Sequence, residues 1–346
     1  MHFSVYGIAK KSVNLPLNIF NNPEMLEAIK QPVDGELKKF EPFFKKNMGS
    51  NIRFLDLITN YIYRNKGKQL RPVIVFLSAG LNGKICESTY VAAGMIELLH
   101  TATLIHDDVV DESFERRGAF SINALWRSKV AVLVGDFLLS KGLLVAVQNK
   151  EYNLLEVMSN AVREMSEGEL LQIEHSRKMD INEAAYYEII RKKTAYLIAS
   201  CCENGAISAG ADSDSIKRMH DFGINLGMAF QIRDDLFDYQ PKGMVGKPNG
   251  NDIKEKKLTL PLIYALREAP AAEGRKILRE IRSRSKSSAT ISAVVKFTEE
   301  YGGISYATGQ MLNFKQQAQE VLSTFPDSEY RHSLMLLTDY VTDRNK

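Results

Sequence analysis

Hydrophobic residues recur at the spacing of an α-helix along nearly the whole chain from about Asn22 onward. Strand patterns, in which Val, Ile or Thr alternate with polar residues between turn signals, are scarce. Pro32 separates two early helical pieces, and Gly, Pro and Asn-Gly breaks divide the rest. The pattern therefore predicts an all-α fold. The later helices are predicted at about 51–63, 71–81, 90–111, 121–127, 130–149, 152–177, 182–209, 213–240, 258–267, 272–282, 289–300, 303–324 and 328–343.

The helix predicted at 90–111 is apolar nearly all round between Met95 and Val110. A helix of this kind belongs in the centre of a large protein. Ser88 is its predicted N-cap, with Thr89 close by. We therefore expect the other helices to pack around this segment.

The chain has 346 residues, a length that alone favours about two domains. No linker or composition shift marks a boundary, however, so the sequence predicts one domain over 1–346. Residues 1–20 form a weakly patterned N-terminal segment. The segment 241–257 is rich in Gly, Pro and Lys, and 282–288 is a basic, polar connector that we expect to be solvated.

Composition is that of a globular protein, with 45% hydrophobic and 25% charged residues. The net charge of +3 is too small to indicate a nucleic acid or an anionic membrane as partner. Cys86, Cys201 and Cys202 are too few for a disulfide scaffold. Buried thiols fit a reducing compartment, so we expect a cytoplasmic protein.

No transmembrane segment is predicted. The most apolar stretch, 131–147, is interrupted by Asp136 and Lys141 and is shorter than the ~20 apolar residues that a span needs. The N-terminus lacks the continuous apolar core of a signal peptide.

Two acidic motifs of the same form, Asp-Asp-x-x-Asp, lie at 107–111 and 234–238, with apolar residues at both x positions. On a helix the first and last Asp of each motif share a face and repel each other. Carboxylates in apolar surroundings need a counter-charge, and a divalent metal is the simplest one. Mg²⁺ takes one or two carboxylates and is completed by substrate phosphates. The predicted metal ligands are Asp107, Asp108, Asp111, Asp234, Asp235 and Asp238.

One such motif alone also suits a solvated helix end or a surface calcium site. Two copies in apolar helices, each with basic residues nearby, favour a clamp that holds a diphosphate between them. His100 lies on the same helix face as Asp107; a lone histidine is more often a core residue, but two turns before the acids it is a candidate for binding. The candidate cations are Lys68, Arg71, Arg116, Arg117, Lys193, Lys247 and Lys257.

Together these stretches resemble the trans-isoprenyl diphosphate synthase (polyprenyl synthetase) family. The matching segments keep the family order over about residues 65–265 and are GKQLRP (67–72), ELLHTATLIHDDVVDESFERRG (97–118), GEL with Gln172 (168–172), KT (193–194), GMAFQIRDDLFD (227–238) and GKPNGND…KLTLP (246–261). The resemblance implies a helical bundle of the isoprenoid synthase type around a large central cavity, usually as a homodimer. It implies a prenyltransferase that uses Mg²⁺ to join isopentenyl diphosphate, head to tail and by a trans double bond, to an allylic diphosphate.

The resemblance also implies roles for single residues. The aspartates of both motifs would hold Mg²⁺ on the allylic diphosphate. That diphosphate would be gripped by Arg116, Lys193, Lys247 and Lys257. The diphosphate of isopentenyl diphosphate would be bound by Lys68, Arg71, His100 and Arg117. The allylic cation would be stabilised by Thr194 and Gln231, with Phe230 packed under the isopentenyl group.

The chain departs from the family at one point. The family usually has Glu-Gly-Lys before Thr-Leu-Pro, and here Lys256 stands at the glycine position. This departure bears on the geometry of 241–257, which is a candidate active-site lid that would exclude water.

Product length is the finer question. Family members with short products carry bulky aromatic residues four or five positions before the first Asp. Here those positions are Thr103 and Ala102, which are both small. We therefore expect a long-chain product, hexa- to nonaprenyl diphosphate, with transient membrane contact as one route for its release.

Three alternatives stay open. Deeper residues could stop growth at farnesyl or geranylgeranyl diphosphate. A class I terpene cyclase shares the first motif but normally has Asn, Ser or Glu in its second. A non-catalytic regulatory subunit typically loses aspartates, and all six are present here.

Overall fold

The computed structural model describes residues 23–116, 118–178, 180, 182–240, 250–283 and 287–343. The N-terminal segment 1–20, Arg117 and the part of the candidate lid at 241–249 lie outside the described residues. The described chain is helical apart from one short antiparallel hairpin, in which β1 (Glu115–Arg116) pairs with β2 (Ala119–Phe120). The all-α prediction is confirmed.

The helices and helical turns follow one another along the chain. They are α1 (Pro23–Lys30), η1 (Gln31–Val33), α2 (Asp34–Met48), α3 (Arg53–Arg64), α4 (Leu70–Asn82), α5 (Glu87–Val110), α6 (Ile122–Gln148), α7 (Tyr152–Lys178), α8 (Glu183–Ile190), η2 (Arg191–Ala195), α9 (Tyr196–Ser208), α10 (Ser213–Leu236), η3 (Phe237–Tyr239), α11 (Asn251–Lys254), α12 (Leu260–Glu268), α13 (Ala271–Arg282), α14 (Ser288–Glu300), α15 (Gly303–Ser323) and α16 (Glu329–Asp343).

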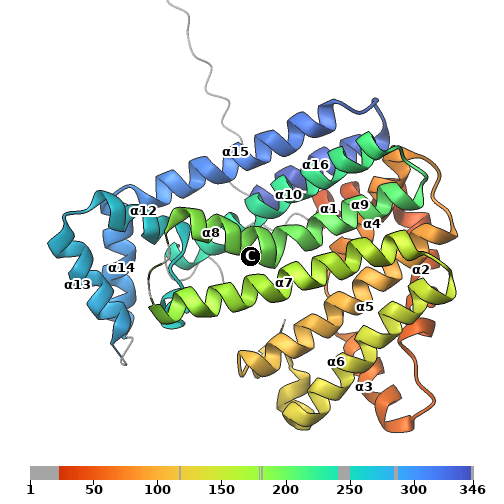
Figure 1. Ribbon diagram of the computed structural model, residues 1–346, viewed down its shortest axis with the longest axis horizontal. Coiled ribbons are helices and arrows are strands. Elements are labelled where there is room, and N and C mark those ends of the chain that lie inside the picture. Colours follow the sequence, from red (N-terminus) through yellow and green to blue (C-terminus); the bar gives the residue numbers. More distant parts are fainter. Residues whose placement is uncertain are drawn as a thin grey trace, which may run out of the picture.

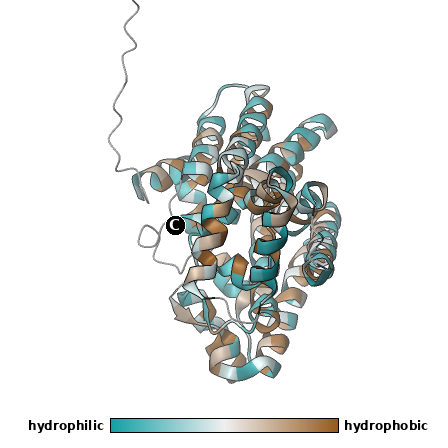
Figure 2. Ribbon diagram, turned by 90° about the vertical axis from the view of Figure 1, so that its left-hand side faces the viewer, coloured by the Kyte–Doolittle hydropathy of each residue, from teal (hydrophilic) through white to brown (hydrophobic). Residues whose placement is uncertain are grey.

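The long helices lie roughly side by side, as Figure 1 shows. α5, α6 and α7 run together, and α9, α10 and α15 continue the bundle above them. α12, α13 and α14 gather at one end of the molecule. Seen from that end, the helices carry hydrophobic and hydrophilic residues around their axes, as amphipathic helices do (Figure 2).

Two buried clusters form the core. The larger lies among α2, α4, α5, α6 and α9, and it includes Phe40, Phe76 and Leu99. The smaller lies among α8, the end of α10, α12 and α15, and it includes Ile232 and Leu262. α5 crosses the larger cluster, as its apolar sequence predicts.

α5 and α6 approach closely because glycines face α5. A Cβ at Gly135 would lie 2.2 Å from the Nε2 atom of His106. A Cβ at Gly142 would lie 3.0 Å from Leu99. The residue directly before the first acidic motif therefore rests on the backbone of α6.

The structure corrects several local predictions. α5 begins at Glu87 after Cys86, whose backbone N–H donates to Thr89 Oγ1 at 3.2 Å, so Ser88 is not the N-cap. The two helices expected at 121–127 and 130–149 both lie within α6, where Arg127, with a positive φ of 67°, divides them near the predicted break. The helix expected at 182–209 is divided by the π-helical turn η2.

Among the described helices, α6 is long and apolar enough to cross a membrane, judged by length and composition. Of its most apolar window, 39% is buried, mainly where it packs on α5. The core helix of a water-soluble protein passes the same test, so the expected absence of a membrane span stays a prediction.

Candidate active site

The first acidic motif occupies the last turn of α5. Asp107 is half-buried and Asp111 is exposed one turn later. Burial raises the pKa of Asp107, the Lys193 charge opposes this, and the charges of Glu169 and Asp111 raise it further. The positive charge near Asp107 is therefore too small to offset its burial and the neighbouring acids.

Asp108 faces a different direction. It is 3% exposed, and its Oδ1 accepts a hydrogen bond from Arg116 Nε at 2.8 Å and forms an ion pair with a terminal nitrogen of Arg116 at 2.8 Å. Arg116 sits on β1, so this ion pair fixes the hairpin that follows α5. Asp108 and Arg116 thus form an ion pair with each other in this structure. The predictions were that Asp108 binds a metal ion and that Arg116 binds the allylic diphosphate.

The second acidic motif spans the end of α10 and η3. Asp235 is 5% exposed and accepts hydrogen bonds from the Tyr186 hydroxyl at 2.7 Å and from Gln231 Nε2 at 2.8 Å. Burial raises the pKa of Asp235 to about 7 despite these two hydrogen bonds, which lower it. Asp238 accepts a hydrogen bond from the backbone N–H of Asp252 at 2.5 Å.

Thr194 and Gln231 are brought together, as the sequence predicts for two residues of one site. Thr194 Oγ1 donates to Gln231 Oε1 at 2.7 Å, and Gln231 then donates to Asp235. A continuous chain of hydrogen bonds thus links the KT segment to the second acidic motif.

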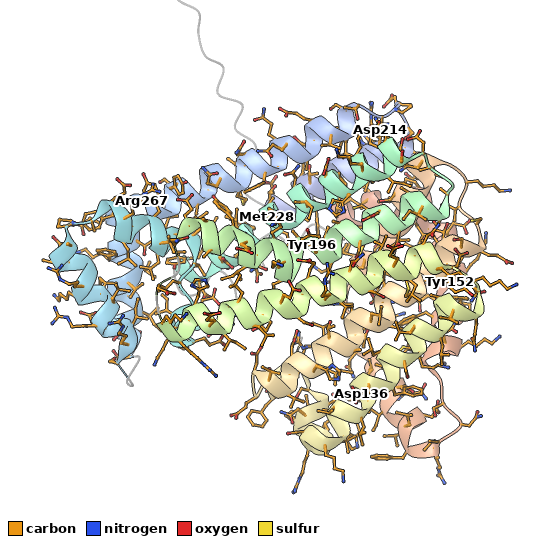
Figure 3. All side chains as sticks on the ribbon, in the orientation of Figure 1. Asp136, Tyr152, Tyr196, Asp214, Met228 and Arg267 are labelled. Carbon is orange, nitrogen blue, oxygen red and sulfur yellow. The ribbon has the colours of Figure 1, made fainter. Side chains whose placement is uncertain are left out.

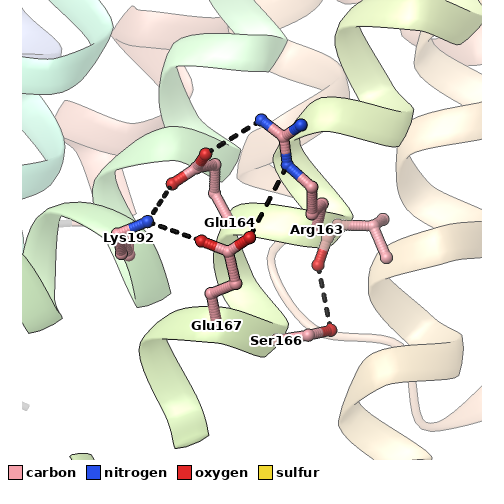
Figure 4. A network of polar contacts seen from close by, with 6 residues as sticks. Arg163, Glu164, Ser166, Glu167 and Lys192 are labelled. Carbon is pink, nitrogen blue, oxygen red and sulfur yellow. Dashed lines mark hydrogen bonds and ion pairs between the residues drawn. The ribbon is translucent and has the colours of Figure 1, made fainter. Parts of the chain in front are cut away.

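The π-helical turn η2 positions this KT segment. Lys192 forms ion pairs with Glu164 at 2.7 Å and Glu167 at 2.8 Å, and Arg163 contacts Glu164 at 3.1 Å (Figure 4). Gly168 lets α7 come close, because a Cβ there would lie 2.8 Å from the Lys193 backbone nitrogen. The extra residue of a π-helical turn, which is frequent at functional sites, is held here by charges on α7.

Lys193 turns toward α7 on the side of the first motif. Its ammonium forms an ion pair with Glu169 and lies 3.4 Å from Gln172 Oε1. Because Lys193 also acts on the pKa of Asp107, it lies between α7 and the first acidic motif.

Lys257 links the two motifs. It forms an ion pair with Glu255 at 2.6 Å. Burial works to lower the pKa of Lys257, but the ion pair with Glu255 and the charges of Asp252 and Asp111 outweigh it and raise the pKa above its usual value. Lys257 is therefore close to an acid of the first motif and to Asp252, which contacts the second.

Asp252 is a site residue that the sequence analysis missed. Burial, Asp235 and Asp238 raise the pKa of Asp252 to about 8. Asp252 is the last residue of the GKPNGND stretch, and its position in that family-like stretch is the sequence signal that could have identified it.

An open cavity of about 900 Å³ lies where these elements meet. It is lined by residues from the end of α5, the end of α7, the turn after α11 and the end of α13. Its charged lining residues are Asp111, Glu112, Glu169, Arg177, Lys178, Glu255, Lys256, Lys257 and Arg282.

The residues predicted for isopentenyl diphosphate are less closely gathered. His100, 7% exposed, lines a small cavity of about 90 Å³ together with Asp108, Arg116 and Gly67. Lys68 instead donates to the Tyr340 hydroxyl at 2.9 Å. Phe230 and Arg71 are partly buried on α10 and α4. Arg117 and Lys247 lie outside the described residues.

The two product-length positions lie on α5. Ala102 is 1% exposed in the larger core, and Thr103 is half-buried with its hydroxyl bonded to the His100 carbonyl at 2.9 Å. Neither position carries a bulky side chain, but the product tunnel itself stays a prediction.

The donor set fits a divalent cation. Within the described residues no three His, Cys, Asp or Glu side chains form a cluster that could hold a metal by themselves. Asp107 and Asp111 lie one turn apart, and the neighbouring acids leave Asp107 short of positive charge. Mg²⁺ prefers such a pair, with water and phosphate oxygens completing its coordination.

Fold and site together define an all-α enzyme with two acidic motifs, of which the first borders a cavity lined by both basic and acidic side chains. A model of the family described as Polyprenyl synthetase matches residues 52–298. Octaprenyl diphosphate synthase of Haemophilus influenzae is 32% identical over 321 residues, which are 92% of this chain and 97% of the relative. The chain belongs to the polyprenyl synthetase family.

Solved structures agree. A decaprenyl diphosphate synthase from Rhodobacter capsulatus superposes with a TM-score of 0.87 at 32% identity, covering 92% of this chain and 98% of that one. A polyprenyl synthase from Caulobacter crescentus, complexed with calcium and isoprenyl diphosphate, gives 0.86 at 31% identity, covering 93% and 98%. The predicted family, fold class and prenyltransferase class are confirmed, and the calcium complex is consistent with use of a divalent metal.

Proposed function

We propose that the protein is a trans-polyprenyl diphosphate synthase that condenses isopentenyl diphosphate head to tail with an allylic diphosphate and releases a hexa- to nonaprenyl diphosphate. The observation that carries the proposal is a cavity of about 900 Å³ that is lined by Asp111 of the first motif and by Lys257. The second motif adjoins this segment, because the Lys257 N–H donates to the Asp252 carbonyl and the Asp252 N–H donates to Asp238. Substrate phosphates would complete the metal coordination that the carboxylates begin.

Acidic and basic residues of the site would have different roles. Asp107 and Asp111, opposite Asp234 and Asp238, would hold Mg²⁺, which supplies positive charge to the departing diphosphate. Lys193 adds fixed positive charge on the side of the first motif, and Lys257 adds it between the motifs. Lys247, which lies outside the described residues, is a further candidate cation by the family resemblance. Such preorganised charges stabilise the leaving group more strongly than water does.

The allylic carbon–oxygen bond breaks and its electron pair leaves with the diphosphate. The dipoles of Thr194 and Gln231 face the allylic cation that remains. The double bond of isopentenyl diphosphate forms the new carbon–carbon bond, and the proton lost in forming the new double bond goes to the released diphosphate. No protein nucleophile takes part, so the site needs only binding, charge and exclusion of water.

The long product is supported by the small residues Ala102 and Thr103 on α5 and by relatives named for octaprenyl and decaprenyl products. A growing chain that leaves the acids toward the N-terminus of α5 meets no aromatic residue at these positions.

We also propose a cytoplasmic homodimer, joined through α6. The face of α6 that does not contact α5 exposes several large apolar side chains, which favour burial against a second copy. They are Leu125, Val132, Leu133, Leu143, Leu144 and Val147. The free thiols Cys86, Cys201 and Cys202 fit a reducing compartment.

The test is incubation of the purified chain with farnesyl diphosphate, isopentenyl diphosphate and Mg²⁺, followed by product sizing. We expect a product longer than geranylgeranyl diphosphate, and none after removal of Mg²⁺ with a chelator. No product from the chain alone would instead favour a regulatory subunit, and a cyclic hydrocarbon would favour a cyclase.

Product length is tested by Ala102→Phe. An aromatic ring there should block growth along α5 and shorten the product by several isoprene units, measured by chromatography of the dephosphorylated products. Thr103→Ser keeps a small side chain and should leave product length unchanged. An unchanged product in Ala102→Phe would place the tunnel elsewhere.

A further inference from the structure

The turn after α11 holds a lysine in a conformation that favours glycine. Lys256 has a φ of 62°. Its N–H donates to the Ile253 carbonyl at 3.2 Å, and the N–H of Lys257 donates to the Asp252 carbonyl at 2.8 Å. These two bonds form a Schellman motif, whose left-handed position is usually glycine. The motif accounts for the family glycine and shows that Lys256 adopts the same backbone conformation against its own preference.

The same motif ends α9 with the expected residue. Gly210 has a φ of 78°, and the matching bonds run from Gly210 to Ile207 and from Ala211 to Ala206. The backbone of this protein thus uses glycine at one such turn and a strained lysine at another. The left-handed backbone alone does not assign a role to Lys256, because other non-glycine residues of the described chain also have a positive φ.

The placement of Lys256 distinguishes it from these other residues. It is exposed and lines the cavity of about 900 Å³ beside Lys257 and Asp111. Glu255, its neighbour in the chain, is already paired with Lys257, and no ion pair joins Lys256 to a carboxylate among the described residues. Its ammonium therefore adds positive charge to the cavity mouth.

We propose that Lys256 is a substrate-capture residue, which draws the diphosphate of the allylic substrate into the cavity at the expense of a strained turn. The inference rests on the proposed function and adds a residue to it. The allylic diphosphate is the ligand because Asp111 of the first acidic motif and Lys257 line the same cavity. An exposed cation at a cavity mouth acts mainly by long-range attraction, which raises association rates and falls with ionic strength.

The chain contains a matched control. Lys150, at the end of α6, also has a φ of 62°, and the same two bonds run from Lys150 to Val147 and from Glu151 to Ala146. Figure 3 labels Tyr152 at this end of α7, whereas the cavity contacts α7 from Glu169 onward. At 1.5 Å per residue Tyr152 and Glu169 are roughly 25 Å apart, so Lys150 has the same backbone strain as Lys256 but lies far from the cavity.

The experiment compares Lys256→Gly, Lys256→Arg and Lys150→Gly by thermal melting and by steady-state kinetics at 50 and 500 mM salt. Both glycine variants should raise Tm by about 2 °C, because the left-handed strain is relieved. Lys256→Gly alone should raise the KM for farnesyl diphosphate about threefold at low salt, with kcat unchanged and the difference lost at high salt. Lys256→Arg should keep the KM of the unmodified protein.

An unchanged KM in Lys256→Gly, or an equal rise in Lys150→Gly, would overturn the proposal and leave Lys256 as a tolerated strained residue. A rise in the KM for isopentenyl diphosphate alone would also overturn it. Absence of activity in the unmodified protein would overturn the proposed function instead, so the two failures are distinguishable.

Discussion

The two acidic motifs have the same sequence pattern, yet their central aspartates are stabilised by different chemistry. Asp108 is buried against the guanidinium of Arg116, a full positive charge. Asp235 is buried against the hydroxyl of Tyr186 and the amide of Gln231, which are neutral donors. The pKa of Asp235 rises to about 7 because burial outweighs those two hydrogen bonds. Identical motifs therefore differ in charge: the first keeps a neutralised ion pair, and the second gains or loses a proton near neutral pH.

The two acidic motifs also differ at their outer aspartates, Asp107 in the first motif and Asp238 in the second. Asp107 interacts with Lys193 and Glu169 across from α7, whereas Asp238 is held by the backbone of Asp252. The first half is thus open to the cavity and the second is tied to the turn that carries Lys257. We infer that the first half recruits the metal and that the second sets the position of the cations around it.

The largest effect should come from Asp107→Asn. Loss of this carboxylate removes a metal ligand, so kcat should fall by at least about 100-fold. Stability of the metal-free protein should not fall, because a carboxyl whose pKa is raised is already disfavoured as an anion. Steady-state kinetics and thermal melting in chelator would measure both. A destabilised Asp107→Asn protein would mean that Asp107 is structural, like Asp108.

A smaller effect, on stability rather than on kcat, is expected from Asp108→Asn. Here the charged partner of Arg116 is lost inside the protein, and the free energy of unfolding should fall by about 2 kcal/mol. Urea denaturation would measure it. Asp111→Asn, at an exposed position of the same motif, is the control and should be neutral in stability. Equal stability of both variants would show that the ion pair with Arg116 contributes nothing.

The smallest effect concerns pH. An unfolded Asp has a pKa of about 3.9, so between about pH 4 and pH 7 the unfolded chain loses the proton of Asp235 while the folded protein keeps it. Stability contributed by this proton is thus full below about pH 4 and is lost as pH rises to about 7. Asp235→Asn cannot ionise, so in chelator its stability relative to the unmodified protein should improve by about 2 kcal/mol from pH 5 to pH 8.

Melting curves at both pH values would measure this difference. If the difference in stability between Asp235→Asn and the unmodified protein were the same at both pH values, Asp235 would not change protonation in this range. The electrostatic difference between the two motifs would then be contradicted.

The sequence predicts most helices because their apolar periodicity is long and regular. It also predicts the break near Arg127, but it does not reveal the π-helical turn at 191–195, because one extra residue leaves the pattern on either side intact. The hairpin at 115–120 is too short for strand periodicity to indicate it.

For the site, residue types and spacing predicted that the acids and the cations Lys193 and Lys257 belong together, and the family resemblance added Thr194. They did not predict which aspartates face the cavity, because that depends on Arg116 and Tyr186, which lie on other elements. Asp252 was missed because one Asp in a polar turn has no periodic signal. Lys256 was singled out by the resemblance, but its strain required the backbone angle.

The separation of partners along the chain also bears on how the site assembles during folding. Asp108 and Arg116 are 8 residues apart and lie on α5 and the hairpin that follows it, next to the α6 helix that packs on α5. Tyr186 and Asp235 are 49 residues apart. Local contacts close with little loss of chain entropy, whereas distant ones close slowly. The first half of the clamp can therefore form as soon as α5 and α6 pair, and the second waits for much more of the chain to be in place.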